Sequence, residues 1–124
     1  MSELKGCYRV ALAALDTGGG VVGVANPEEA DIIVTKVVIQ TTTIATAACT
    51  LDAGIVAAIT TVGANLIDGL DVNSAIGVFD NIDDQGTDGK ASQKWDSDEY
   101  FTISKKTGAA AGLVGYVYIE YYRA

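Results

Sequence analysis

Apolar and polar residues alternate with a period of two in several short segments, which is typical of β-strands whose two faces meet different surroundings. Residues 112–122 are the clearest case. There Val117, Ile119 and Tyr121 alternate with a set of aromatic and acidic residues: Tyr116, Tyr118, Glu120 and Tyr122. The pattern predicts a strand with one face in the core and an aromatic row with a carboxylate on the other.

Two further segments near the N-terminus also predict strands. Residues 6–15 alternate, and the inward set that we expect is Tyr8, Val10, Leu12 and Ala14. Residues 31–46 are dense in Ile, Val and Thr, whose branched side chains are stiff and suit a pleated surface. Both faces of this segment are apolar at first, which predicts a central strand, sandwiched on both sides, that leaves the core at threonines 41–43.

The middle of the chain is harder to interpret. The alanines of residues 47–62 suit a helix, but their threonines and Gly54 do not. We favour a strand over 47–51 and a turn over 52–54, and leave 55–62 open. Short apolar pieces separated by turn residues over 65–84 predict a long ordered loop, followed by a turn over 85–90.

Short strands are expected again over 94–95 and 100–104, with a solvated turn over 105–108 that contains Lys105 and Lys106. Evenly spaced short strands with glycine-rich turns predict an all-β fold, an antiparallel β-sandwich that is jelly-roll-like. The 124 residues suffice for a single domain, in which residues 1–5 form a flexible N-terminal arm.

Composition restricts the partners. Apolar residues make up 49% of the chain, but no run approaches the ~20 residues that span a bilayer, so no membrane partner is expected. Sixteen acidic against eight basic residues give a formal charge of −8, which disfavours nucleic acid and suits a basic surface on a protein.

The N-terminal segment and the cysteines indicate where the protein is made. The apolar run of residues 10–15 is shorter than the core of a secretory signal, so we expect a retained N-terminus and synthesis in a host cytoplasm. Cys7 and Cys49 are too few for a disulfide framework and are expected to be free, mostly buried thiols.

Catalytic and cofactor motifs are weak. The chain has no histidine, which excludes Ser/His/Asp and Cys/His arrangements. Gly18, Gly20 and Gly23 formally match a dinucleotide-binding fingerprint, but Pro27 follows within a few residues where that motif needs a helix. We therefore expect no enzyme activity and no cofactor.

An acidic cluster is the one candidate metal site. It consists of Asp80, Asp83, Asp84 and Asp88. Carboxylates and loop carbonyls could hold Ca²⁺, but the spacing of an EF-hand fails, because Ile82 or Gly86 stands where a ligand belongs. The alternative is a solvated turn whose aspartates cap backbone amides.

Aromatic residues supply the candidate interface. Its members are Trp95, Tyr116, Tyr118 and Tyr122. Such a row could stack on a sugar ring, as in a carbohydrate-binding module or a receptor-binding tail-fibre domain. The alternative is a protein interface or ordinary sheet packing.

Two longer segments carry a resemblance: DIIVTKVVIQTTTIATAACTLDAGI, and NLIDGLDVNSAIGVFDNIDDQGTDGK, followed by the ending TGAAAGLVGYVYIEYY. In this order they resemble small virion proteins of tailed bacteriophages, encoded near the capsid genes, over residues 31–122. The resemblance implies a sandwich or jelly-roll fold, a capsid decoration or cement role on the virion surface, and no catalytic residue.

The hypothesis from the sequence is therefore a non-enzymatic virion structural protein that binds the major capsid protein and itself. Repeated sites on a shell favour a symmetric oligomer, and we favour a trimer. The contact segments that we expect are residues 1–8 and 65–90, because loops and termini present variable surface on a rigid sandwich.

Overall fold

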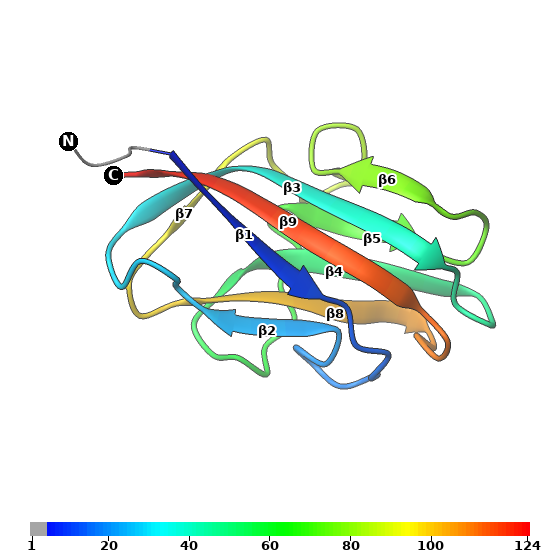
Figure 1. The fold of residues 1–124 in the computed structure, drawn as a ribbon. Coiled ribbons are helices and arrows are strands. Elements are labelled where there is room, and N and C mark those ends of the chain that lie inside the picture. Colours follow the sequence, from blue (N-terminus) through cyan, green and yellow to red (C-terminus); the bar gives the residue numbers. More distant parts are fainter. Residues whose placement is uncertain (1–4) are drawn as a thin grey trace.

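The computed structural model describes residues 5–124, which form nine β-strands and no helix (Figure 1). The strands are β1 (Lys5–Ala11), β2 (Val22–Ala25), β3 (Ile32–Thr43), β4 (Cys49–Val56), β5 (Ile67–Asp71), β6 (Gly77–Asp80), β7 (Gln93–Trp95), β8 (Tyr100–Gly108) and β9 (Val114–Arg123). Within this part of the chain no helix is long and apolar enough to cross a membrane.

The strands form two antiparallel sheets. Sheet A has the order β1-β9-β3-β6, with β7 pairing the start of β3 beside β6, and sheet B has the order β2-β8-β4-β5. From β1 to β4 the chain changes sheet at every step, and β8 and β9 return between the early strands. This is jelly-roll connectivity. The predicted all-β, antiparallel sandwich is confirmed.

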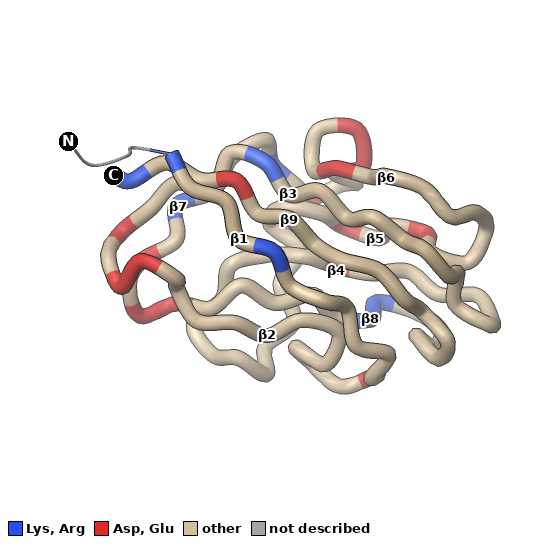
Figure 2. The backbone as a smooth tube through the Cα atoms, in the orientation of Figure 1, with Lys and Arg blue, Asp and Glu red and all other residues tan. Residues whose placement is uncertain are grey.

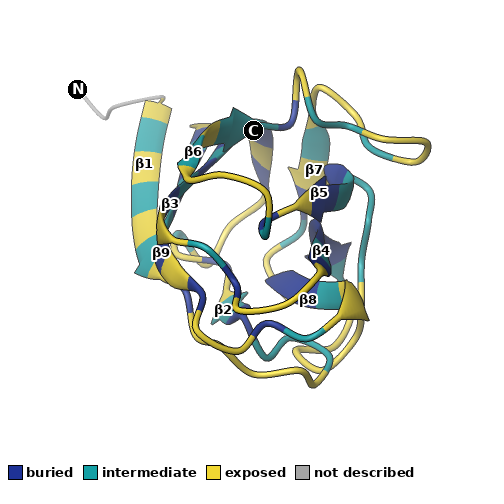
Figure 3. Ribbon diagram, turned by 90° about the vertical axis from the view of Figure 1, so that its right-hand side faces the viewer, coloured by how far each residue is buried: buried dark blue, intermediate teal, exposed yellow. Residues whose placement is uncertain are grey.

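The core lies between the two sheets, where the buried bands of both face each other (Figure 3). Its largest fully buried side chains include Trp95 and Phe101, with branched residues from β3, β4, β5 and β9 around them. No cavity or cleft opens anywhere in residues 5–124. The inward set predicted for the last strand is confirmed, since Val117, Ile119 and Tyr121 are all buried.

Strand β3 corrects one prediction. It is central in sheet A, but only one of its faces is buried, and Ile33 is exposed. The pairing with β9 shifts register between Val34 and Lys36, so Ile32 and Val34 point inward before the shift and Val37 and Ile39 after it. A β-bulge thus makes one buried face look like two in the sequence.

A threonine hydroxyl accompanies each bulge of β3. The Thr35 hydroxyl donates to the carbonyl of Glu120 at 3.4 Å, and the Thr42 hydroxyl donates to the carbonyl of Val114 at 3.3 Å, where a second shift occurs. A bulge disrupts the regular ladder, and these hydroxyls provide bonds across the gap.

Strand β4 corrects a second prediction. The turn expected over 52–54 is wrong, because β4 runs straight through Asp52, Ala53 and Gly54, all buried. A loop covers the outer face of sheet B here, and the Asn65 amide group pairs with both backbone groups of Ile55 at 2.8 and 3.0 Å. A Cβ at Gly54 would lie 2.5 Å from the Asn65 side-chain oxygen, so the glycine reflects close covering rather than a turn.

The long loop expected over 65–84 contains β5 and β6, because its short apolar pieces pair with β4 and β3. The turn expected over 105–108 is also wrong. Lys105 and Lys106 belong to β8, which continues beside β4 to Gly108. Local turn composition was misleading in both segments because cross-strand pairing decided the structure.

The N-terminal segment and the two cysteines differ in part from the prediction. Of the expected arm over residues 1–5, residues 1–4 lie outside the described part of the chain, and Lys5 is the first residue of β1. Both cysteines are free thiols, as predicted, but only Cys49 is buried and Cys7 is exposed.

Candidate interaction surface on sheet A

The outer face of sheet A gathers the three tyrosines expected at an interface. Tyr116, Tyr118 and Tyr122 lie on the side of β9 that points away from the core, and Tyr122 is 43% exposed. In register beside them stand Arg9 of β1 and Val38 of β3, both opposite Tyr118, and Ile33, opposite Tyr122. We call this set, together with Val78 of β6 and the neighbouring cations Lys5 and Lys36, the tyrosine face.

Two cations from β1 hold the aromatic rings. The Arg9 guanidinium lies 4.7 Å from the centre of the Tyr116 ring. The Lys5 Nζ lies 6.0 Å from the Tyr122 ring centre and 2.9 Å from Glu120 Oε1, and the hydrogen bond to Glu120 raises the pKa of Lys5. Cation–π contacts of this kind orient the rings.

Aliphatic residues that the sequence reasoning missed extend the tyrosine face. Val78 in β6 is 68% exposed and pairs with Gln40, which itself stands opposite Tyr116. Ile76, just before β6, is 62% exposed. The available signal was the apolar pair Val78 and Phe79, of which Phe79 packs on the core and Val78 faces outward. Exposed apolar side chains beside aromatic rings are typical of interaction sites.

Trp95, the fourth predicted interface residue, does not belong to this surface. It is fully buried, its ring centre lies 6.1 Å from that of Phe101, and its Nε1 donates to the carbonyl of Glu99 at 2.9 Å. Trp95 is a core residue with a satisfied indole N–H. A sugar platform that includes Trp95 is therefore excluded by burial.

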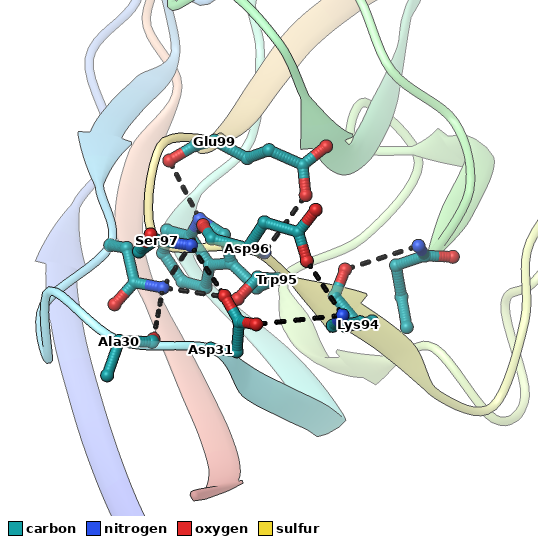
Figure 4. A network of polar contacts seen from close by, with 9 residues as sticks. Ala30, Asp31, Lys94, Trp95, Asp96, Ser97 and Glu99 are labelled. Carbon is teal, nitrogen blue, oxygen red and sulfur yellow. Dashed lines mark hydrogen bonds and ion pairs between the residues drawn. The ribbon is translucent and has the colours of Figure 1, made fainter. Parts of the chain in front are cut away.

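The polar network around Trp95 closes one end of the sandwich (Figure 4). Asn26 Nδ2 donates to the carbonyls of Ala30 at 2.9 Å and of Trp95 at 3.2 Å. The Lys94 Nζ lies between Asp31 and Asp96, at 3.6 and 3.2 Å, and the hydrogen bond to Asp96 raises its pKa. These contacts tie the loops before β3 and after β7 together.

Two of the four predicted calcium ligands, Asp80 and Asp84, cap backbone amides. Asp80 Oδ1 accepts bonds from the amides of Ile82 and Asp83, both at 2.8 Å, and Asp84 Oδ2 accepts from the Asp80 amide at 3.3 Å. Asp88 lies apart from them, with its amide donating to Asp68. Across residues 5–124 no group of three or more cysteine or acidic side chains could hold a metal ion. The capping alternative describes this loop.

A second acidic group, which the sequence did not suggest, lies at the β4–β5 pair. Asp52 is buried, stands opposite Asp68, and accepts a bond from the Gly69 amide at 3.0 Å. Burial is the main cause that raises the pKa of Asp52, and the charge of the neighbouring Asp68 raises it further. The Lys106 ammonium, 2.5 Å from Asp68 Oδ1, lowers the pKa of Asp68.

This acid pair has the opposed pKa shifts of an acid–base couple, and the contacts that the structure shows for it lie within the fold. The described residues form no cleft, and the Asp68 side chain is only 6% exposed. Its contacts are those of a structural pair, because they join β4, β5, β8 and the loop that carries Asp88.

Comparison with protein-family models, with curated protein sequences and with solved structures found no match for this chain.

Proposed function

We propose that this protein is a non-enzymatic structural subunit that binds another protein through the tyrosine face. The observation that carries the proposal is an exposed aromatic and aliphatic sheet face on a molecule whose described residues form no cleft. A flat face can bury rings and methyl groups against a partner, whereas a substrate needs a concave site.

The charge distribution supports a protein partner. Acidic residues concentrate at the loops of the sandwich ends, whereas β1 contributes only the cations Lys5 and Arg9 (Figure 2). On the tyrosine face these cations, with Lys36, stand beside the single β9 carboxylate of Glu120. The tyrosine face thus does not carry the acidic excess of the whole chain. Apolar contacts with a partner are therefore not opposed by a large negative charge on this face.

The specific partner that we propose is the major capsid protein of a tailed bacteriophage, with the subunit on the capsid surface as decoration or cement. The support is the resemblance of residues 31–122 together with the jelly-roll fold, which viral capsid domains also use. Part of the expected contact segment 65–90 contributes to the tyrosine face through Val78. The other expected segment, residues 1–8, contributes Lys5; residues 1–4 lie outside the described chain.

The test is co-sedimentation with shells assembled from a tailed-phage major capsid protein encoded in the same genome. We expect the wild type to sediment with shells and the double variant Tyr118→Ser, Val78→Ser to bind at least about tenfold more weakly, because a half-buried ring and an exposed aliphatic side chain are removed from the face. Thermal unfolding would show that the variant is folded.

The matched control is Ile59→Ser with Val62→Ser, which removes apolar groups of 44% and 49% exposure from the loop over sheet B. This variant should bind as the wild type does. Equal binding by both double variants would refute the role of the tyrosine face, and a wild type that stays in solution would refute the capsid assignment.

A further inference from the structure

Strand β1 is one edge of sheet A, and the alternation of its hydrogen bonds to β9 shows which of its backbone groups lie open. The Leu12 amide donates to the carbonyl of Gly115 at 2.9 Å, in the same register as the β1–β9 pairs. In an antiparallel ladder, pairs that exchange hydrogen bonds alternate with pairs that do not. Even-numbered residues of β1 therefore bond to β9, and the odd-numbered residues point their N–H and C=O groups away from it.

The next odd residue supports this assignment. The Ala13 amide points away from β9 and donates to the carbonyl of Val21 at 2.9 Å, which covers the edge just beyond β1. No described strand pairs with the corresponding side of β1 itself, which forms the outer margin of the molecule in Figure 3. The open groups belong to Lys5, Cys7, Arg9 and Ala11, all exposed residues.

This edge lacks the usual protection against pairing. Protective devices are short edge strands, prolines, bulges and charges. The other edge strands β2, β6 and β7 have three or four residues, and β5 has a bulge at Gly69. Strand β1 has seven residues and pairs with β9 without a register shift. Its two cations are directed back over β9, to Glu120 and to the Tyr116 ring.

We propose that β1 pairs with β1 of a second copy of this chain, antiparallel about a twofold axis at Tyr8. The two copies of sheet A then form one continuous sheet through the β1 edges. A twofold pairing closes with two copies, so the unit that we infer is a dimer, where the sequence favoured a trimer. The tyrosines and Val78 of the tyrosine face are not required for this contact.

Charge selects the register. Odd-numbered residues can exchange bonds with Cys7 opposite Cys7, with Arg9 opposite Arg9, or with Cys7 opposite Arg9 of the other copy. The first register places Lys5 opposite Arg9 and the second places Arg9 opposite itself, and like charges directly opposite each other destabilise a strand pair. The third places Lys5 opposite Ala11 and also pairs all seven residues of β1.

In that register the two Cys7 residues are diagonal neighbours, at ~7–8 Å, which is beyond the span of a disulfide. The dimer should therefore persist in a reducing agent. Sedimentation or light scattering over a concentration series should show a mass that rises from one chain to two. A single-chain mass up to about 1 mM protein, at the weak end of specific binding, would overturn the proposal.

The first variant pair tests the edge. In Cys7→Pro the proline removes a backbone N–H that does not bond to β9, so the fold should survive and the dimer should be lost. Cys7→Ser keeps that N–H and should remain dimeric. A folded Cys7→Pro that dimerises like Cys7→Ser would overturn the proposal.

The second pair of variants tests the register, and it also tests the β1–β1 pairing if Cys7→Pro does not fold. Ala11→Lys places a cation opposite Lys5 of the other copy and should weaken the dimer about tenfold through two symmetric repulsions, while Ala11→Glu should not weaken it. Equal dimerisation of the two variants would overturn the pairing. The Tyr118→Ser, Val78→Ser variant should stay dimeric, so this test stands apart from the capsid assignment.

Discussion

At the scale of single residues, Asp52 is the group whose environment differs most from what its sequence context suggests. A Leu-Asp-Ala-Gly segment is typical of a turn, yet Asp52 is buried in the middle of β4 and bonds to the Gly69 amide. Burial disfavours the ionised form of Asp52, and the negative charge of Asp68 disfavours it further. Both effects raise the pKa of Asp52.

Asp52→Asn should therefore be at least as stable as the wild type at pH 7. The amide oxygen can still accept from Gly69, and the charge is gone. Because the folded protein holds the Asp52 proton more tightly than the unfolded chain, this residue's contribution to stability falls as pH rises above its ordinary pKa of 3.8. The advantage of the variant should vanish towards pH 3, as measured by urea unfolding at both pH values.

Asp52→Ala is the control for this prediction. It also removes the charge, but it leaves the Gly69 amide without its acceptor, which should cost about 1–3 kcal/mol. An Asp52→Asn variant that is less stable than the wild type by the same amount at both pH values would show that the carboxylate is needed for its shape rather than disfavoured for its charge.

Trp95 gives the second prediction at this scale. Trp95→Ala should lower the free energy of unfolding by about 3–5 kcal/mol, because it empties a fully buried site beside Phe101. Chemical denaturation measures the loss, and the fluorescence of this single tryptophan should be blue-shifted in the folded wild type. An unchanged free energy of unfolding would contradict the packed, fully buried position of Trp95.

At the scale of elements, Asn81 joins three segments. Its Oδ1 accepts from the Val37 amide at 2.8 Å, between the stretches of β3 that pair with β7 and β6. Its Nδ2 donates to the carbonyls of Lys90 and Ala91 at 2.9 and 3.2 Å. One buried side chain thus takes the place of a missing piece of strand.

Asn81→Asp should destabilise the protein by about 3 kcal/mol at pH 7, because two donated bonds are lost and a carboxylate faces carbonyl oxygens. Asn73→Asp is the matched control, since that side chain donates one bond, to Ala45, from a half-buried site. Urea unfolding should show a clearly smaller loss for Asn73→Asp. Equal losses would mean that the bridge between β3 and the 90–91 segment contributes little.

Elements were predictable where one period ran through a strand. The alternation of Val117, Ile119 and Tyr121 survives in β9 because β9 itself contains no extra residue. The same reasoning failed in β3, because a residue there is extra only relative to its partner β9. It also failed at Gly54, which is a glycine because the Asn65 side chain packs against it. Pairing and covering are tertiary facts that a local pattern does not contain.

At the scale of the whole molecule, the jelly roll was predictable and half of the candidate site was. The tyrosine row follows from the alternation of β9, but Val78, Lys5 and Arg9 join it only through the strand order of sheet A. Trp95 was misplaced because a three-residue strand has no period from which its inward face could be deduced.

The two proposed surfaces lie on the same sheet, and this couples them. Pairing β1 with β1 of a second copy would place two tyrosine faces on one continuous sheet. A repeated lattice could then bind both faces, and the second contact would form at a high effective concentration. A weak single face is sufficient in such an arrangement.

The two bulges of β3, at Thr35 and Thr42, also determine where a residue can be deleted from this strand. Thr35 and Thr42 are the residues without a partner in β9, so deleting either one leaves the inward and outward positions of all other β3 residues unchanged. Deleting a residue between them, such as Val38, would invert the sides of its neighbours up to the next bulge. Single-codon losses in β3 are therefore tolerable at these two threonines, and natural length variation in this strand should be confined to them.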